Sequence, residues 1–255
     1  MQIATWNVNS IRARLAAVCQ WLATHRPEVL CLQETKVQDG DFPEKEFKEV
    51  GYHAAFWGQK SYNGVALLSL TPLDDVRFGF PETEWNEQKR LMTATIHGVR
   101  IVNVYIPNGE TPASPKFDYK LAFIHHLRAH LDQTYSPDRP VVLVGDFNVA
   151  PEPEDVYPSA GWEADVLFHP QSRAAIAHLA AWGFADVFRK YHAGGGHYSW
   201  WDYREAAFRR NLGARIDHIW ASPTAAARCR ACEIDCAPRG ELKPSDHAPV
   251  TVTLE

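Results

Sequence analysis

The sequence lacks a long apolar run, an excess of positive charge and a paired set of cysteines. No apolar run approaches the roughly 20 residues that span a bilayer, so we expect no membrane anchor. The 255 residues carry a net charge of −5, which argues against a chain that binds nucleic acid through overall basicity. An acidic enzyme can still carry a local basic rim, so the distribution of charge matters more than its sum.

The cysteines are five in number, and an odd count does not suit the disulfide framework of a secreted domain. Cys229, Cys232 and Cys236 lie close together, but no Cys or His pair stands elsewhere at zinc-finger spacing. Their stretch also alternates like a strand, so we interpret these cysteines as structural. The first residues show no pattern of a targeting segment, and we expect a cytoplasmic protein.

Hydrophobic residues make up 45% of the chain, which is enough for a large core. Helices are predicted over residues 10–25, 116–132 and 171–182. Strands are predicted over residues 2–6, 28–32, 52–57, 64–70, 91–97, 100–106, 141–144, 197–201, 215–221, 230–235 and 248–254. This mixture of strand–helix alternation and hairpins predicts packed α/β layers, and no linker interrupts residues 1–255, so we expect one domain.

Polar residues of chemically useful types gather at the predicted strand ends. They are Asn7, Glu34, Tyr105, Asp146, Asn148, Asp217 and His247. Any one of them alone would be interpreted as a solvated loop residue, because loops are polar. If the strands share sheets, however, their ends converge on one rim, and so many candidates together indicate a site.

Such a rim suits the hydrolysis of a phosphodiester, whose oxygens must be neutralised while a water is aligned. Glu34 and Asp246 are candidate ligands for a divalent metal ion, although Glu34 alone would be interpreted as an ion pair with Lys36. Asp146 and Asn148 are two residues apart and point the same way on an extended segment. The Asp can activate water and the Asn can donate to a phosphoryl oxygen, but both types also favour turns.

His247 and Asp217 are candidates for a histidine that an aspartate orients, since such a histidine must present one chosen nitrogen. A structural or surface histidine remains the alternative. Cations are also interleaved with aromatic residues: Arg204, Arg209, Arg210 and Arg215 stand near Trp200, Trp201 and Tyr203. That pattern suits a phosphate backbone and an unstacked sugar or base, and equally a solvated loop over buried aromatic rings.

Taken together, the motifs closely resemble those of the exonuclease III family of bacterial DNA-repair nucleases, within the endonuclease/exonuclease/phosphatase superfamily. The matching segments occur in family order over nearly the full chain: Thr5–Asn9, Leu32–Lys36, Gly58–Lys60, Asn63–Ala66, Asn103–Tyr105, Gly145–Asn148, Trp200–Arg204, Arg215–Asp217 and Lys243–Pro249. Ser-Asp-His marks only the superfamily. The Gln-Glu-Thr-Lys and Trp-Trp-Asp-Tyr-Arg segments are more specific to the DNA-repair branch.

The resemblance implies a four-layer α/β sandwich, in which two mixed sheets pack face to face with helices outside. It implies Mg²⁺ or Mn²⁺ as the cofactor and duplex DNA with abasic sites or blocked 3′ ends as the substrate. The implied reactions are abasic-site incision, removal of 3′-blocking groups and 3′-to-5′ exonuclease trimming. We expect the enzyme to be a monomer.

Residue roles follow by position in the matching motifs. Glu34 resembles the principal metal ligand, and the expected supporting ligands are Asn7, Asp146, Asn148 and Asp246. Asp146 also resembles the residue that activates water. His247, oriented by Asp217, and Tyr105 are expected to contact phosphate or the leaving group. The residues expected to contact DNA or to form the abasic pocket are Lys36, Leu167, Phe168, Trp200, Arg204 and Ile216.

The sequence departs from the family pattern near the expected pocket. Leu167 stands where related enzymes often place a small residue, and Ala214 replaces a bulkier apolar one. We therefore expect internal incision to be weak beside 3′-end processing, unless Leu167 points into the core. One rival is a superfamily phosphatase or phosphodiesterase of a non-DNA substrate, such as inositol phosphates or sphingomyelin. The other is a catalytically inactive binding module, against which the intact candidate residues argue.

Overall fold

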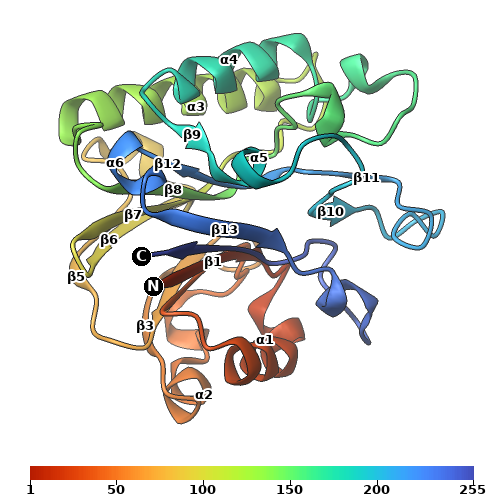
Figure 1. Ribbon diagram of the computed structural model, residues 1–255. Coiled ribbons are helices and arrows are strands. Elements are labelled where there is room, and N and C mark those ends of the chain that lie inside the picture. The colour runs from red at the N-terminus through yellow and green to blue at the C-terminus, as the bar shows by residue number, and fades with distance from the viewer.

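Two six-stranded mixed sheets form the centre of the computed structural model, which describes residues 1–255. The strand order in the first sheet is β13-β14-β1-β2-β4-β3, and in the second it is β5-β6-β7-β8-β12-β9. The sheets pack face to face with helices on both outer faces (Figure 1). The four-layer α/β sandwich expected from the resemblance is therefore confirmed.

The strands of the first sheet are β1 (Gln2–Asn7), β2 (Val29–Gln33), β3 (His53–Trp57), β4 (Val65–Ser69), β13 (Cys229–Ile234) and β14 (Val250–Leu254). Those of the second sheet are β5 (Asp74–Phe78), β6 (Leu91–Ile96), β7 (Val99–Tyr105), β8 (Val141–Asp146), β9 (Ala185–Asp186) and β12 (Asp217–Ala221). A separate pair is β10 (Trp200–Trp201) with β11 (Gly213–Ala214). The predicted strand over 197–201 is thus only two residues long, and β5 and β9 were not predicted.

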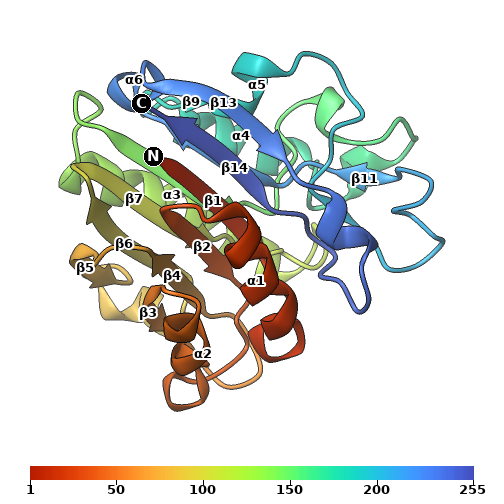
Figure 2. The same ribbon diagram turned by 60° about the horizontal axis from the view of Figure 1, so that its bottom comes forward.

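Four of the six helices lie on the two outer faces, whereas two short ones contribute residues to the core between the sheets. Their bounds are α1 (Ile11–His25), α2 (Glu44–Glu49), α3 (Pro115–Thr134), α4 (Pro170–Ala180), α5 (Val187–Tyr191) and α6 (Pro223–Ala226). Apolar residues of α1 and α2 pack on the first sheet, and those of α3 and α4 pack on the second (Figures 1 and 2). The three predicted helices are confirmed as α1, α3 and α4, and the short helices α2, α5 and α6 were missed. None of the helices is long and apolar enough to cross a membrane.

The core between the sheets is the largest apolar cluster, with 23 buried residues drawn from both sheets and from α5 and α6. Cys229 and Cys232 of β13 belong to this cluster, which agrees with the structural interpretation of these cysteines. Alternate residues of each central strand face the other way, toward the helices. Because both faces of β1, β2, β4 and β8 are covered, every residue of the β8 run Val141–Val144 is buried, as its continuous apolar character predicts.

One buried polar bridge crosses this apolar interface between the sheets. Nε2 of Gln33 in β2 donates to Oδ1 of Asn103 in β7 at 2.7 Å. Nδ2 of Asn103 in turn donates to the main-chain oxygens of Leu32 and Ala66 at 3.1 and 3.0 Å. Gln33 and Asn103 are fully buried. Gln33 directly precedes Glu34, and Asn103 stands two residues before Tyr105, so the bridge lies beneath the rim.

The strand register brings the candidate residues of the second sheet into one row. Tyr105 of β7 lies opposite Asp146 of β8, and Asp146 lies opposite Asp217 of β12. In the first sheet, Asn7 ends β1 and Glu34 follows β2 directly. The two sheets therefore present their polar strand ends at the same rim of the sandwich.

Candidate active site

A cavity of about 390 Å³ opens at this rim and collects most of the predicted site residues. Those that line it are Asn7, Glu34, Tyr105, Asp146, Asn148, Leu167, Trp200, Arg204, Ile216, Asp246 and His247. The structure thus assembles residues that the sequence spreads over 241 positions, from β1 to the loop before β14. Asp217 does not line the cavity because it lies behind His247.

Glu34 lies in one corner of the cavity, in a left-handed backbone conformation with φ 54°. Its Oε1 accepts a hydrogen bond from the Tyr105 hydroxyl, and its Oε2 lies 3.3 Å from Nζ of Lys36. Burial, followed by the charge of Glu34, raises the pKa of Tyr105 well above its usual value, so this phenol stays a donor. The ion pair with Lys36 is therefore present, but it leaves the carboxylate on the cavity wall.

Asp146 lies at the bottom of the cavity and is 1% exposed. Its Oδ2 accepts from Nδ2 of Asn7 at 2.8 Å and from Nδ2 of Asn148 at 3.2 Å. Its Oδ1 accepts from the main-chain N–H of Asn148 at 2.8 Å. Burial raises the pKa of Asp146 to about 7, although nearby His247 acts in the opposite direction. A carboxylate with that pKa is suited to take a proton from water near neutral pH.

His247 connects Asp146 and Asp217. Its Nδ1 lies 2.9 Å from Oδ2 of Asp217, and its Nε2 lies 3.9 Å from Oδ2 of Asp146. Burial alone would lower the pKa of His247, but Asp217, Asp246 and Asp146 together raise it to about 10. His247 is therefore an imidazolium at neutral pH, and one side of it faces the cavity.

Two groups of residues offer ligand atoms for a metal ion. The first comprises Asp146, Asp217 and His247, whose ligand atoms lie within 4.8 Å of one another. In this group the imidazolium already supplies the positive charge between the carboxylates, so a second cation there is disfavoured. The other group is Glu34, Asn7 and Asp246, which line the same cavity and offer only carboxylate and amide oxygens. Hard divalent cations prefer such oxygens, so the second group fits a metal ion better.

Asp246 is held in place from two sides. Its Oδ1 accepts from Nδ2 of Asn9 at 2.8 Å, and its Oδ2 accepts from Nε1 of Trp200 at 3.0 Å. Each carboxylate oxygen keeps further acceptor capacity. Burial would raise the pKa of Asp246, but His247 and these hydrogen bonds lower it below its usual value, so the group is ionised. Asn9 also accepts from Nζ of Lys36 at 2.6 Å and therefore links Asp246 to the Glu34 corner.

The apolar wall of the cavity comes from Trp200, Leu167 and Ile216. Leu167 is 5% exposed and packs in an apolar cluster with Ile216, so it belongs both to the cavity wall and to a local core. Phe168, expected as a second wall, does not line the cavity. It packs in the same apolar cluster as Leu167 and Ile216, and the guanidinium of Arg173 covers its ring at 4.4 Å.

The predicted basic surface is smaller than the sequence indicates. Arg215 is 1% exposed and its guanidinium contacts Asp155 and Asp186 at 2.6 and 2.7 Å, so it belongs neither to a DNA-facing surface nor to a solvated loop, the two alternatives that the sequence left open. Arg204 is exposed at the cavity mouth and pairs with Asp202 at 2.6 Å. Arg215 can be buried because Asp155 and Asp186, which are distant in the sequence, pair with it. A buried guanidinium without such partners would cost a large free energy of desolvation.

Lys120 is a positioning residue that the sequence did not reveal. It is fully buried in α3, and its Nζ donates to the main-chain oxygens of Asn108, Asn148 and Val166 at 3.1, 2.7 and 2.7 Å. Burial lowers the pKa of Lys120 to about 7, an effect that Asp146 partly offsets. A single ammonium group therefore fastens three loops that line the cavity.

Comparison with known proteins gives a family match over residues 4–247, and the family is described as the endonuclease/exonuclease/phosphatase family. The chain belongs to this family. Exodeoxyribonuclease III of Haemophilus influenzae is 34% identical over 98% of both chains. DNA repair nuclease APEX1 of Danio rerio is 30% identical over 100% of this chain and 82% of its own length. The resemblance to the exonuclease III branch is thus confirmed, and the protein is a hydrolase whose relatives support a DNA-repair nuclease function.

Solved structures of family members superpose closely on this one. An AP endonuclease from Archaeoglobus fulgidus is 42% identical with a TM-score of 0.97, and the match covers 100% of this chain and 99% of that one. The 3′ phosphatase NExo from Neisseria, bound to a product DNA hairpin, is 40% identical with a TM-score of 0.95 and the same coverage. The two neighbours are named for different activities, so similarity alone does not decide between them.

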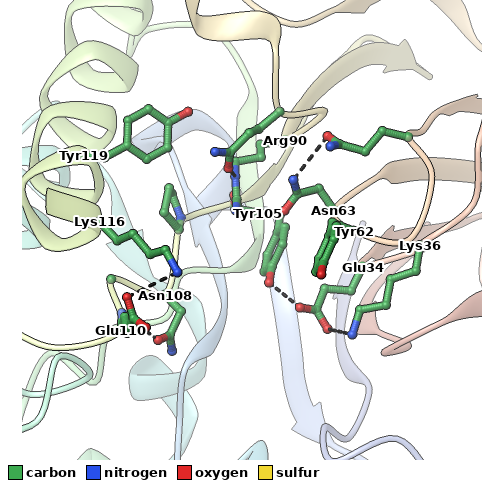
Figure 3. Close-up of a pocket in the computed structure, with 14 residues that line it drawn as sticks. Glu34, Lys36, Tyr62, Asn63, Arg90, Tyr105, Asn108, Glu110, Lys116 and Tyr119 are labelled. Carbon is green, nitrogen blue, oxygen red and sulfur yellow. Dashed lines mark hydrogen bonds and ion pairs between the residues drawn. The ribbon is translucent and has the colours of Figure 1, made fainter. Parts of the chain in front are cut away.

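Beside the candidate active site lies a larger polar cavity of about 520 Å³. Glu34 and Tyr105 line both cavities and form the partition between them. Figure 3 shows Lys36 and Tyr62 near Glu34 and places Lys116 across the cavity from them. Both lysines pair with carboxylates of this cavity, Lys36 with Glu34 at 3.3 Å and Lys116 with Glu110 at 3.2 Å.

Proposed function

We propose that this chain is a single-domain, monomeric, Mg²⁺- or Mn²⁺-dependent phosphodiesterase of DNA repair. Its proposed substrate is duplex DNA with a blocked 3′ end or an abasic site. The observation that carries the proposal is the placement of Asp146 between Asn7 and His247 at the bottom of one cavity. The same cavity is lined by Asp146 as the proton acceptor, by the imidazolium of His247 and by the carboxylate of Glu34.

In the proposed reaction, the His247 imidazolium contacts a non-bridging phosphoryl oxygen and offsets its developing charge. Asp217 fixes the ring through its hydrogen bond to Nδ1, so that Nε2 is presented to the cavity. Asp146 takes a proton from the attacking water, while Asn7 and Asn148 hold its oxygens in place. Tyr105 is a neutral donor near the leaving oxygen.

The oxygens of Glu34, Asn7 and Asp246 are the proposed metal ligands. A bound divalent cation would supply charge neutralisation of the phosphoryl and leaving oxygens. Lys36 now balances Glu34 at 3.3 Å and can turn toward DNA phosphate once another cation takes its place. Arg204 at the cavity mouth is the proposed contact to the phosphate backbone.

We further propose that 3′-end processing exceeds internal abasic-site incision. Leu167 and Ile216 fill the apolar side of the cavity, next to Trp200. An internal abasic nucleotide must be extruded from the duplex and needs more room than a free 3′ terminus. Overfilling a tight site by a side chain costs about 1–3 kcal/mol, which corresponds to a rate loss of roughly 10- to 100-fold.

The deciding assay compares duplexes that carry a 3′-phosphate, an internal abasic analogue or neither lesion, each with Mg²⁺, Mn²⁺ or EDTA. We expect rapid metal-dependent removal of the 3′-phosphate, slower incision at the abasic analogue and no reaction in EDTA. Absence of any DNA cleavage, together with hydrolysis of an inositol phosphate or sphingomyelin, would replace this proposal with the non-DNA alternative. Light scattering of the same preparation tests the monomer.

A further inference from the structure

A second recess, of about 290 Å³, adjoins the candidate active-site cavity at Trp200. Its aromatic walls are Tyr157, Trp162 and Trp200. Trp200, Asp202 and Arg204 line both this recess and the active-site cavity, so the two hollows are neighbours with a shared boundary. Nothing in the reaction proposed above uses Tyr157 or Trp162.

The aromatic walls are held by hydrogen bonds that leave ring faces available. Nε1 of Trp162 donates to the main-chain oxygen of Tyr157 at 2.9 Å, and Nε1 of Trp200 donates to Asp246 at 3.0 Å. The rings of Tyr157 and Trp162 meet edge to face with centroids 5.2 Å apart. All three rings remain partly exposed. Because the indole N–H groups of Trp162 and Trp200 are already hydrogen-bonded, little ordering of these two rings is needed when a flat ligand enters.

The charges around the recess narrow the choice of occupant. Its polar lining includes Asp202 and Glu205, while Arg204 is already paired with Asp202 at 2.6 Å. The lining of the recess holds two carboxylates and one cation, so its net negative charge disfavours a phosphate. A flat, uncharged group whose amino hydrogens can meet carboxylate oxygens fits these walls better, and nucleobases have those properties.

We propose that this recess binds an unpaired nucleobase of the DNA strand, belonging to the nucleotide next to the reacting phosphate. The inference rests on the proposed action on DNA. It goes beyond that proposal by stating that the enzyme prefers a 3′ end whose terminal base is unpaired. Because the two hollows share three side chains, adjacent nucleotides of one strand can occupy them together. A paired base must leave its duplex stack to reach the recess, whereas a mismatched base is already freer to do so.

The proposal therefore predicts selectivity for 3′-blocked ends whose terminal base is mismatched. The free energy of stacking a base on aromatic side chains is large enough to give a preference of about 10-fold in kcat/KM over the fully paired end. Removing one aromatic wall should reduce that preference toward one, while the rate on the paired end stays within about threefold because the reacting residues are untouched.

The experiment uses two duplexes with a 3′-phosphate, identical except that the terminal base is paired or mismatched. The unmodified enzyme is compared with Trp162→Ala and Tyr157→Leu, and with Trp162→Phe, which keeps a ring and should keep the preference. Phe78→Ala is the matched control, because Phe78 is an aromatic residue 47% exposed on the edge strand β5. Equal preference in Trp162→Ala, Tyr157→Leu and the unmodified enzyme would overturn the proposal.

A binding measurement separates this inference from the proposed function. 2-Aminopurine at the mismatched terminus, with Ca²⁺ as the metal, should lose fluorescence on binding to the enzyme through stacking on the aromatic rings. Quenching should weaken in Trp162→Ala and persist in Phe78→Ala. Failure of cleavage on every DNA with this quenching intact would contradict only the proposed hydrolysis. Cleavage with quenching equal in Trp162→Ala and the unmodified enzyme would contradict only the recess.

Discussion

His247 and Asp217 are joined by a hydrogen bond of 2.9 Å between Nδ1 and Oδ2, although 30 residues separate them in the sequence. Asp217 is buried behind the imidazole, whereas His247 reaches the cavity. The carboxylate can therefore influence a bound phosphate only through the ring. This arrangement makes the pair a single unit in which each member depends on the other.

We predict that substitutions in this pair are non-additive. Asp217→Asn and His247→Asn should each lower the single-turnover rate, and the double variant should cost little more than the worse single change, because both remove the same oriented imidazolium. Rates of all four proteins on a 3′-phosphate duplex form the complete cycle. Losses that multiply would show that the two residues act separately.

We predict a fall in activity at alkaline pH that depends on Asp217. Burial opposes the charged form, but neighbouring carboxylates raise the pKa of His247 from 6.5 to about 10. The stabilisation from this raised pKa is fully present below pH 6.5 and is lost as pH rises through about 10. In Asp217→Asn the alkaline limb of the pH–rate profile should move down by roughly 1–3 pH units. An unmoved limb would contradict the assignment to His247.

Glu34→Ala is predicted to weaken metal binding and to lower the rate by a factor of about 100 or more, since charge stabilisation at the phosphate is lost. The fold should survive, because Glu34 lies on the cavity wall outside the apolar clusters. The measurement is activity as a function of Mg²⁺ concentration. Glu49→Ala on α2, whose side chain is 64% exposed, is the matched control. Activity within a few-fold of the parent across the titration would exclude Glu34 as the principal ligand.

DNA binding should weaken as the salt concentration rises, even though the chain carries a net charge of −5. The candidate cations are Arg204, Arg209 and Arg210, of which Arg204 and Arg210 pair with carboxylates and Arg209 has no ion-pair partner. Removing an arginine that contacts phosphate should flatten the plot of log affinity against log salt by about one unit. The measurement uses Ca²⁺ to prevent cleavage. Unchanged slopes in all three single variants would place the DNA elsewhere.

Leu167→Gly and Leu167→Ser are predicted to shift activity toward internal incision. Leu167 lines the cavity, so its removal opens space for an extruded abasic sugar, with an expected gain of roughly 10- to 100-fold relative to 3′-end processing. Parallel rates on an internal abasic analogue and on a 3′-phosphate end give the ratio. The same variants lose apolar packing, so a thermal unfolding curve is the necessary control. A constant ratio would show that Leu167 does not restrict the pocket.

Strands with a strong apolar pattern could be predicted from the sequence. Strands that form only because the fold places them beside another strand could not. The run Val141–Val144 became the buried strand β8 because both of its faces are covered. Strand β5 was missed because Asp74, Asp75 and Arg77 give it no apolar alternation. It is an edge strand whose side chains are mostly exposed, so charged residues are tolerated there. These charges also discourage pairing of the strand with another chain.

The convergence of candidate residues on one cavity could be predicted where residue type and strand end coincide, as for Glu34 and Asp146. Lys120 could not, because a lysine within an amphipathic helix usually faces solvent, and only three distant carbonyl groups make its burial possible. The burial of Arg215 could not be predicted for a similar reason, since its partners Asp155 and Asp186 lie 60 and 29 residues away. Such pairings depend on how the chain folds back and leave no local pattern.

The bridge between Gln33 and Asn103 has a mechanical consequence for an active site divided between two sheets. Apolar surfaces alone attract without direction and permit small sliding displacements, but a buried hydrogen bond of 2.7 Å has a preferred length and angle. The bridge therefore resists sliding of one sheet over the other and fixes the spacing between the Glu34 side and the Asp146 side of the cavity. Loops around the cavity can then differ in length while the distance between its two halves stays constant.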